Sequence, residues 1–243
     1  MTQQDMSQSG THFVFDPMAV RYDRCNHLFS LGIDHYWRRK LVKTARAHAH
    51  QHVLDVCSGT GDIVYSFLKH SPVRHIVGID LSESMIHLAM EKQILYSSKG
   101  WMYNKQLEWK VADAADAGLE SDHFDIVSCA FGIRNVCQRQ ASLDEMYRVL
   151  KLNGKLYFLE FSLPANPLLR LMYRFYLDRF MPLMGKWIVG DRKPLEYLAQ
   201  SIRRWHTEVD FAKELDQAGF RLLYKTPLTG GIVTMWTAVK VAK

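Results

Sequence analysis

Five short hydrophobic runs recur along the chain, separated by longer segments whose apolar residues are spaced as on one side of a helix. The runs are HVLDV (52–56), HIVGID (75–80), LEWKVAD (107–113), FDIVSCAF (124–131) and KLYFLEF (155–161). Strands that are apolar at nearly every position and alternate with helices are typical of a parallel sheet covered on both faces. The pattern therefore predicts a doubly wound, Rossmann-like α/β fold.

Two further apolar segments follow near the C-terminal end of the sequence. FRLLYKT (220–226) and GIVTMWTAVK (231–240) flank the turn-forming residues that begin at Pro227. Two such segments joined by a glycine-containing turn indicate an antiparallel hairpin. We expect the hairpin to complete a mostly parallel sheet of seven strands, the five runs plus these two.

Two regions lie outside this alternation and should cover the functional edge of the sheet. Residues 13–50 are expected to form an N-terminal helical cap, and residues 163–206 an insertion over the site. A length of 243 residues is compatible with one α/β domain, so residues 13–243 are assigned to a single domain after a disordered tail at 1–12.

Serine and glycine residues suggest where two helices begin and end. Ser82 or Ser84 can cap the helical segment that ends near Tyr96, and Ser142 precedes LDEMYRVLK. That second helix is expected to stop at Asn153 and Gly154.

A glycine turn follows the first predicted strand, in VLDVCSGTGD (53–62). Gly59 and Gly61 let the backbone turn tightly and approach a ligand at the carboxyl end of the strand. Asp55 and Asp62 flank the turn and would repel a pyrophosphate, so a dinucleotide fits poorly. The two carboxylates suit a cofactor with an ammonium and a sulfonium group, which describes S-adenosylmethionine (SAM).

The next two predicted strands also end in acidic residues. Asp80 ends the second strand, where a carboxylate can accept hydrogen bonds from ribose hydroxyls. Asp113, followed by Ala114, ends the third, where it can accept one from an adenine amine. Each residue also has an ordinary interpretation, Asp80 as a helix cap and Asp113 as a solvated loop residue; together with the glycine turn they favour a SAM site.

Composition and charge narrow the partners and the compartment. The net charge of +6 and pI of about 9.1 fit an acidic partner, either nucleic acid or an anionic membrane surface. No RNA-binding module or basic aromatic platform is recognisable, so nucleic acid is not expected. Without a signal peptide or an apolar run of about 18 residues, we expect a cytoplasmic protein, either free or peripheral at the inner face of the membrane.

No metal site is expected. The four cysteines form no CxxC pair, which argues against a zinc site or a disulfide framework. The histidine-rich HAHQH (48–52) directly precedes a strand, and we interpret it as a solvated loop.

Four longer motifs carry a resemblance to a known family. They are FDPMAVRYDRCNHLFSLGIDHYW (15–37), FGIRNV (131–136), EMYRVLKLNGKLYFLEFS (145–162) and YLAQSIR (197–203). With the glycine turn, they make the chain resemble class I SAM-dependent methyltransferases, and within them the ubiquinone/menaquinone biosynthesis C-methyltransferases. The family usually has glycine where this chain has Ser58, and many relatives have serine at the position of Ala130.

The resemblance implies a cofactor, an acceptor and a set of site residues. The cofactor is SAM, contacted by Thr60, Asp80, and Asp113 with Ala114, and the acceptor is a polyprenylated quinol that receives a methyl group on a ring carbon. Arg134 and Asn135 are implied to line the quinol pocket.

Arg134 comes just after the fourth predicted strand, and an always-charged side chain next to a buried strand requires an explanation. A guanidinium stays protonated and therefore cannot readily serve as a base, but its N–H donors can stabilise a phenolate oxygen. Asn135 could orient the acceptor hydroxyl or a water that takes its proton. The alternative is a structural arginine bound to backbone carbonyls. Tyr22 is expected to be catalytic, and the candidate bases are Tyr22, Asp23, Glu160, Tyr197 and His206.

The insertion is both basic and aromatic between residues 164 and 194. Such a stretch could lie at a membrane interface, or it could pack in the core or in a homodimer contact. Two alternatives to quinol methylation also stay open: SAM-dependent methylation of RNA or another small molecule, and a non-catalytic SAM-binding subunit of a quinone-synthesis complex.

Overall fold

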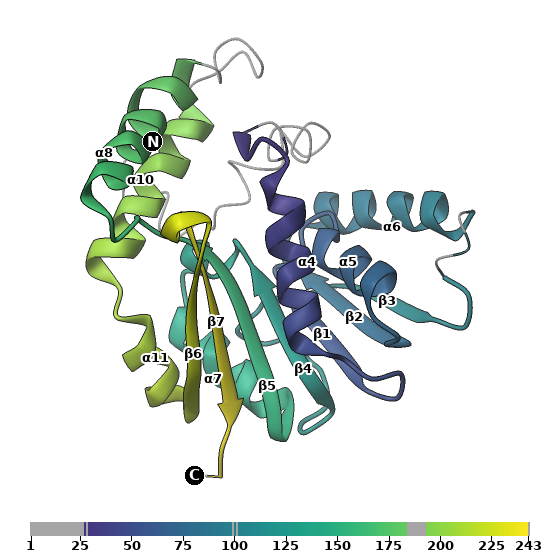
Figure 1. The fold of residues 1–243 in the computed structure, drawn as a ribbon. Coiled ribbons are helices and arrows are strands. Elements are labelled where there is room, and N and C mark those ends of the chain that lie inside the picture. The colour runs from purple at the N-terminus through teal and green to yellow at the C-terminus, as the bar shows by residue number, and fades with distance from the viewer. Residues whose placement is uncertain (1–26, 28, 99, 101, 184–192, 243) are drawn as a thin grey trace.

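A seven-stranded sheet forms the centre of the molecule, with strand order β3-β2-β1-β4-β5-β7-β6 (Figure 1). The computed structural model describes residues 27, 29–98, 100, 102–183 and 193–242. The strands are β1 (His52–Val56), β2 (His75–Asp80), β3 (Gln106–Val111), β4 (Phe124–Ala130), β5 (Leu150–Phe161), β6 (Phe220–Leu228) and β7 (Val233–Lys240). Neighbours pair in parallel except where β7 runs antiparallel to β5 and β6. The predicted doubly wound sheet and its C-terminal hairpin are confirmed.

Helices cover both faces of this sheet (Figure 1). One face carries α4 (Ile33–Ala45), α5 (Asp62–His70) and α6 (Glu83–Ser97), and the other carries α7 (Arg139–Val149) and α11 (Phe211–Ala218). Successive residues of β1 supply the two cores, because side chains alternate across a strand. Val53 packs with the α4 and α5 side chains, whereas Leu54 packs with those of α7 and α11.

The insertion between β5 and α11 is helical. It contains α8 (Pro167–Phe175), the π-helical turn η3 (Tyr176–Phe180) and α10 (Lys193–Glu208), which lie side by side beyond the carboxyl end of β5 (Figure 1). Asn166 caps α8 by accepting hydrogen bonds from the next turn's backbone, and Pro167 occupies the first helical turn. Buried side chains of all three helices form a small core of their own.

Of the two serines predicted at helix starts, one caps its helix and the other does not. Ser82 caps α6 as predicted, since its hydroxyl accepts a hydrogen bond from the Met85 N–H at 3.3 Å. Ser142 is wrong as a cap. It lies buried inside α7, where its hydroxyl donates to the Gln138 carbonyl at 3.1 Å.

The end of α7 also differs from the prediction. The helix ends at Val149 instead of at Asn153 and Gly154. Leu150 is fully buried and already pairs with Phe124 of β4, so strand pairing begins immediately after the helix. Burial of one leucine in the sheet outweighs the local stop signal of the later Asn-Gly pair.

Within the segment expected to be a helical cap, residues 13–50, the structure describes the helix α4 at residues 33–45, and residues 46–50 are not helical. The tail at 1–12 and the first part of the cap lie outside the described residues. Within the described ranges, no helix combines the length and hydropathy needed to cross a bilayer.

Candidate active site

The glycine turn at the end of β1 leaves free space beside its backbone at Gly59. Cys57, Gly59 and Gly61 have φ angles of 55°, 54° and 86°, in the left-handed region. A Cβ at Gly59 would meet nothing within 4 Å, whereas one at Gly61 would lie 2.4 Å from the Trp109 ring. Ser58 needs no positive φ, and its hydroxyl donates to the Asp55 carbonyl at 2.8 Å. A ligand can therefore approach the backbone at Gly59.

Acidic residues at the ends of the next two strands flank this turn. Asp80, at the end of β2, accepts hydrogen bonds from the Gly59 N–H at 2.7 Å and the Ser82 N–H at 3.0 Å. Asp113 follows β3 and accepts one from the Ala115 N–H at 2.9 Å. The carboxylates lie along the carboxyl edge of the sheet, as the sequence predicted.

Asp55 is a buried carboxyl group at the end of β1. Its Oδ1 accepts a hydrogen bond from the Ser128 hydroxyl of β4 at 2.7 Å. Burial raises the pKa of Asp55 to about 7, against the opposing effect of Ser128. A cation placed beside the carboxyl group would keep it ionised.

A cavity of about 360 Å³ extends from the glycine turn to the insertion. Its polar end includes Asp55, Ser58, Gly59, Thr60 and Asp62. Its other end is apolar and is lined from the insertion by Leu169, Met172, Tyr173, Leu177, Leu195 and Ile202. Of the predicted cofactor residues, Gly61, Asp80, Asp113 and Ala114 do not line this cavity.

An ionic network at the start of α4 borders the polar end. Asp34 accepts hydrogen bonds from the Ser30 hydroxyl and His27 Nδ1, both at 2.6 Å, and from Arg38. Burial acts to raise the pKa of Asp34, but Arg38, Ser30 and His27 outweigh it and lower the pKa to about 2. The Arg38 guanidinium also lies 3.2 Å from the Asp62 carboxylate of α5, so the network joins α4 to the glycine turn.

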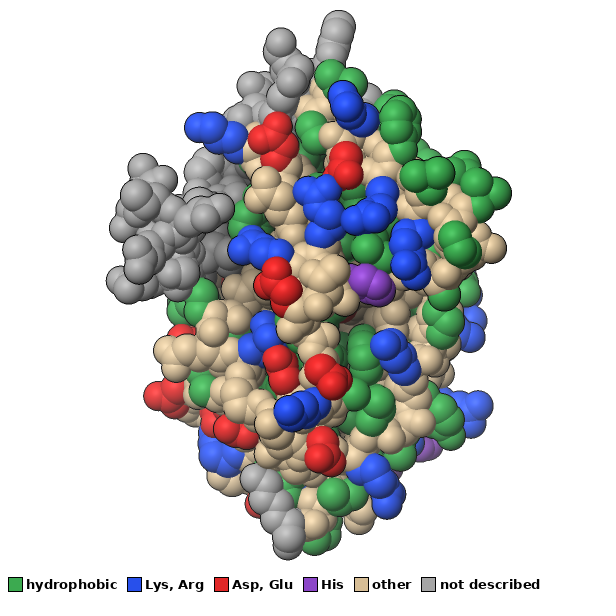
Figure 2. All heavy atoms as spheres, turned by 90° about the vertical axis from the view of Figure 1, so that its left-hand side faces the viewer, with side chains coloured by type: hydrophobic (Ala, Val, Ile, Leu, Met, Phe, Trp, Pro, Cys, Tyr) green, Lys and Arg blue, Asp and Glu red, His purple; other side chains and the backbone are tan. Residues whose placement is uncertain are grey.

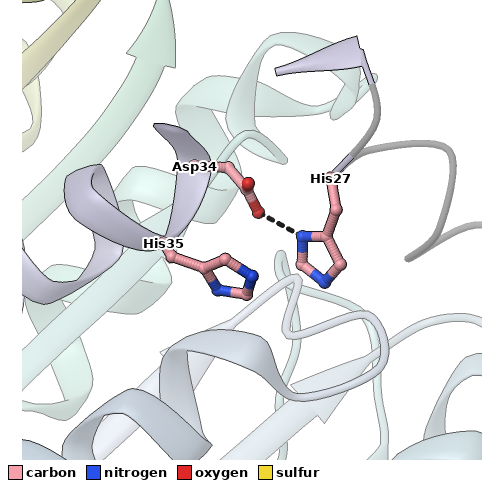
Figure 3. Close-up of side chains that lie close together, drawn as sticks. All are labelled: His27, Asp34 and His35. Carbon is pink, nitrogen blue, oxygen red and sulfur yellow. Dashed lines mark hydrogen bonds and ion pairs between the residues drawn. The ribbon is translucent and has the colours of Figure 1, made fainter. Parts of the chain in front are cut away.

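His27, Asp34 and His35 bring three potential metal ligands together, but their geometry does not suit a metal (Figure 3). The His27 and His35 rings are stacked, with centroids 4.2 Å apart and planes 28° from parallel. In-plane nitrogen lone pairs of stacked rings do not converge on one ion. The oxygens of Asp34 already accept three hydrogen bonds, so this cluster is better explained as a structural network.

Arg134 is held by a buried ion pair. It lies in the short 3₁₀ helix η2 (Ile133–Asn135) after β4, and its Nη1 donates to Glu160 Oε1 at 2.6 Å and to the Phe131 carbonyl at 2.7 Å. Its side chain is 5% exposed and that of Glu160 is 0% exposed. Burial raises the pKa of Glu160, and Arg134 opposes that effect. Glu160 is thus a partner of the guanidinium, which makes it a poor candidate for the base.

One donor of Arg134 remains available to the cavity. Nε donates to the Ser201 hydroxyl of α10 at 3.4 Å, whereas Nη2 has no hydrogen-bond acceptor within the described part of the chain. The backbone-carbonyl contact of the alternative interpretation is present, but it uses Nη1 alone. Because Arg134 lines the cavity, Nη2 can serve a bound oxygen.

None of the other predicted catalytic residues that the structure describes lines the cavity as Arg134 does. Asn135 does not line the cavity, and its amide oxygen accepts a hydrogen bond from the Tyr197 hydroxyl at 3.3 Å. His206 is exposed and also lies outside the lining. Tyr22 and Asp23 fall outside the described residues.

Sequence reasoning missed the ionic network and the aromatic centre of the cavity. Asp34 and Arg38 are spaced four residues apart with opposite charges, which is the recognisable sign of a helical ion pair. Phe131 directly follows β4 and Phe161 is the last residue of β5, and their ring centroids lie 4.7 Å apart. Only the pairing of β4 with β5 brings these two rings together.

Comparison with known proteins agrees with this fold. Solved methyltransferase structures share the fold: one from Methanococcus maripaludis, described as a putative S-adenosyl-L-methionine-dependent methyltransferase, has a TM-score of 0.62 at 18% identity, with 93% of each chain covered. A putative methyltransferase from Bacillus halodurans has a TM-score of 0.58 at 19% identity, covering 84% of this chain and 99% of the other.

Curated relatives share more of their sequence with this chain than these solved structures do. A protein from Syntrophotalea carbinolica named "Ubiquinone/menaquinone biosynthesis C-methyltransferase UbiE" is 37% identical over 95% of this chain and 94% of its own length. A protein of the same name from Cereibacter sphaeroides is 35% identical over 95% and 90%. Residues 2–240 match the ubiE/COQ5 methyltransferase family. The chain belongs to this family and is a SAM-dependent C-methyltransferase of quinone biosynthesis.

Proposed function

We propose that the protein transfers a methyl group from SAM to a ring carbon of a polyprenylated quinol. One observation carries the proposal: a single cavity joins the glycine turn, the buried guanidinium of Arg134 and an apolar chamber under the insertion. A quinol with an isoprenoid tail has matching parts, because its hydroxyl needs a polar partner and its tail an apolar one. The names of the relatives fit the same class of acceptor.

The residues at the glycine turn fit SAM, which supplies an electrophilic methyl group on a sulfonium. Gly59 leaves open space beside its backbone, and Thr60 lines the same end of the cavity. The raised pKa of Asp55 favours an ammonium as its neighbour. We assign Asp80, and Asp113 with Ala114, to the adenosine part, because a carboxylate has acceptor sites for hydroxyls and amines.

Arg134 is proposed to stabilise the acceptor as a phenolate. A phenol has a pKa of about 10, and each unit by which a site lowers that pKa corresponds to about 1.4 kcal/mol. The Nη2 of Arg134 can donate to the developing oxyanion, while Glu160 and the Phe131 carbonyl fix the guanidinium through Nη1. The apolar walls limit water near the oxyanion and therefore strengthen this interaction.

Asn135 and Tyr22 are assigned supporting roles. The Tyr197 hydroxyl donates to the Asn135 amide oxygen and fixes it on η2, next to Arg134 in the chain. We propose that this pair orients the acceptor or a water that takes the proton. Tyr22 keeps its expected catalytic role as a candidate base.

The decisive assay is methyl transfer under anaerobic conditions with deuterated-methyl SAM. A demethylmenaquinol and a methoxy-benzoquinol are offered in detergent with a reductant, and mass spectrometry locates the label. A labelled methyl on ring carbon supports the proposal and ranks the two rings. SAM binding without label on either ring would instead favour RNA, another small molecule or a non-catalytic role. Arg134→Gln should bind SAM normally and lose turnover by orders of magnitude.

We also propose that α8 rests on an anionic membrane surface, from which the acceptor reaches the cavity. Leu168, Leu171, Met172 and Phe175 are each more than 60% exposed on this helix, and Figure 2 shows hydrophobic side chains gathered beside Lys and Arg on this face. Met172 is exposed and also lines the cavity, so α8 separates the cavity from solvent. Apolar groups beside cations match an interface of acyl chains and phosphates.

Vesicle flotation tests the membrane contact. Wild-type protein should float with phosphatidylglycerol vesicles and not with phosphatidylcholine vesicles, and Phe175→Glu should abolish flotation. Leu152→Glu is the control, because Leu152 is 56% exposed near the opposite end of β5. Failure to float, together with a dimer by sedimentation that Phe175→Glu dissociates, would show that α8 is a homodimer contact instead.

A further inference from the structure

Two cations line the cavity, and each lies close to one ring of an aromatic pair. Within the described residues of the lining, Arg38 and Arg134 are the only Lys or Arg side chains. The Arg38 guanidinium lies 5.7 Å from the centre of the Phe131 ring, and that of Arg134 lies 5.3 Å from the centre of the Phe161 ring. The two rings contact each other, with centroids 4.7 Å apart, and the two guanidinium groups make different ion pairs, Arg38 with Asp34 and Asp62 and Arg134 with Glu160. Arg134 belongs to the acceptor, which leaves Arg38 without an assigned ligand.

Arg38 lies beside the glycine turn and is fixed there by charge. Its guanidinium bonds to Asp34 on its own helix and to Asp62, the first residue of α5. Lys92 of α6 donates to Asp62 at 3.1 Å and to the Thr60 hydroxyl at 2.8 Å. Burial acts to raise the pKa of Asp62, but Arg38 and Lys92 outweigh it and lower the pKa. The two carboxylates and two cations therefore balance at neutral pH.

A balanced network can accept a zwitterion without leaving a buried net charge. The amino-acid part of SAM is such a group, with an ammonium and a carboxylate on one carbon. Asp55 lines the polar end and suits the ammonium, so the carboxylate needs a donor within the same end. A guanidinium carries several N–H donors in a planar fork, which can serve more than one carboxylate at once.

We propose that Arg38 binds the carboxylate of the methionine part of SAM. Asp34 and Asp62 hold the guanidinium in place before the cofactor arrives, which limits the entropy lost on binding. The Phe131 ring lies beside the guanidinium. The inference rests on SAM as the cofactor and is independent of the acceptor.

The test compares two cofactors that differ only in the carboxylate. SAM and decarboxylated SAM are titrated into the full-length protein by isothermal calorimetry, without any acceptor. Wild-type protein should bind SAM about 10- to 100-fold more tightly, the range expected for loss of a charge-assisted hydrogen-bond pair. Arg38→Gln should weaken SAM by a similar factor and leave decarboxylated SAM within about twofold, so that the preference disappears.

Arg39→Gln is the matched control, because Arg39 is the neighbouring arginine on α4 and is exposed. It should keep the preference for SAM. The proposal is overturned if wild-type protein does not prefer SAM, a result that needs no folded variant. It is also overturned if Arg38→Gln keeps the preference, or weakens both ligands equally, since either outcome would give Arg38 a purely structural role. A failed quinol assay would affect neither comparison.

Discussion

The Arg134–Glu160 pair allows a quantitative prediction for Glu160→Gln. Glutamine keeps the shape of the side chain and an oxygen acceptor but removes the charge. Glu160 Oε1 also accepts from the Phe161 N–H at 2.9 Å, a contact that the glutamine oxygen can retain, whereas Oε2 accepts from the Arg134 N–H at 3.3 Å, a contact that the glutamine NH2 group cannot replace. Breaking a buried pair by removing one partner costs about 3–5 kcal/mol. Because one of these two contacts is lost with the charge, we expect a cost of at least about 3 kcal/mol.

Thermal and denaturant unfolding measure this loss directly. For a chain of this size, each kcal/mol shifts Tm by about 2–4 °C, so Glu160→Gln should lower Tm by at least about 6–12 °C. The control is Glu214→Gln, which removes the partner of Arg139 in an ion pair whose side chains are both 22% exposed. A partly exposed pair contributes about 1 kcal/mol or less, so the control should change Tm by a few degrees at most.

A double variant shows whether the loss comes from the pair itself. Arg134→Met combined with Glu160→Gln should be destabilised by less than the sum of the two single variants, because no charge is then left buried without a partner. The reasoning is refuted if Glu160→Gln unfolds within about 1 kcal/mol of wild type while Glu214→Gln does the same. That result would mean that Glu160 carries no charge in the folded protein.

Two further predictions concern the glycine turn and the histidines at the opposite edge of the sheet. Gly61→Ala should lower the free energy of unfolding, measured in urea, by about 2 kcal/mol or more, because φ is 86° and a Cβ would meet Trp109 at 2.4 Å. Gly59→Ala should lower it by about 1 kcal/mol, because a Cβ there would meet open space. Equal losses in the two variants would contradict the steric argument. Burial and the nearby His123 lower the pKa of His52, whose Nδ1 lies 2.9 Å from His123 Nε2. Because the unfolded chain then binds more protons than the folded protein, the free energy of unfolding should fall as the pH drops below about 6.5. His52→Asn should make this pH dependence weaker in thermal melts from about pH 7.5 to about pH 5.5. An unchanged dependence would exclude His52 as its source.

Local sequence patterns were sufficient for the sheet and the cofactor edge. The apolar runs placed the strands, and Asp55 and Asp80 followed from the rule that ligands bind at the carboxyl ends of parallel strands. The predicted C-terminal end of α7 was wrong because the Asn153–Gly154 pair is a local signal, which the burial of Leu150 against β4 outweighs. The predicted start was wrong because Ser142 lies buried inside the helix, which begins at Arg139.

Contacts between distant segments explain what the sequence could not predict. Arg134 was recognisable as important, but its partner Glu160 lies 26 residues away and is placed by the pairing of β4 with β5. The approach of Arg38 to Asp62 likewise depends on how α4 packs on α5, which periodicity does not specify. One-dimensional patterns give the residue types that can carry chemistry, and packing decides which of them meet.

The position of β7 has a consequence for the synthesis of the protein. Every residue of this strand is buried, and it lies between β5 and β6 although it follows all other strands in the sequence. A ribosome therefore releases the remaining strands before the sheet can close, and the edge of β5 stays unpaired until residues 233–240 have left the exit tunnel. An open edge of this kind recruits other strands. Nascent chains of this protein should accordingly depend on a chaperone more than those of a sheet whose last strand lies at its edge.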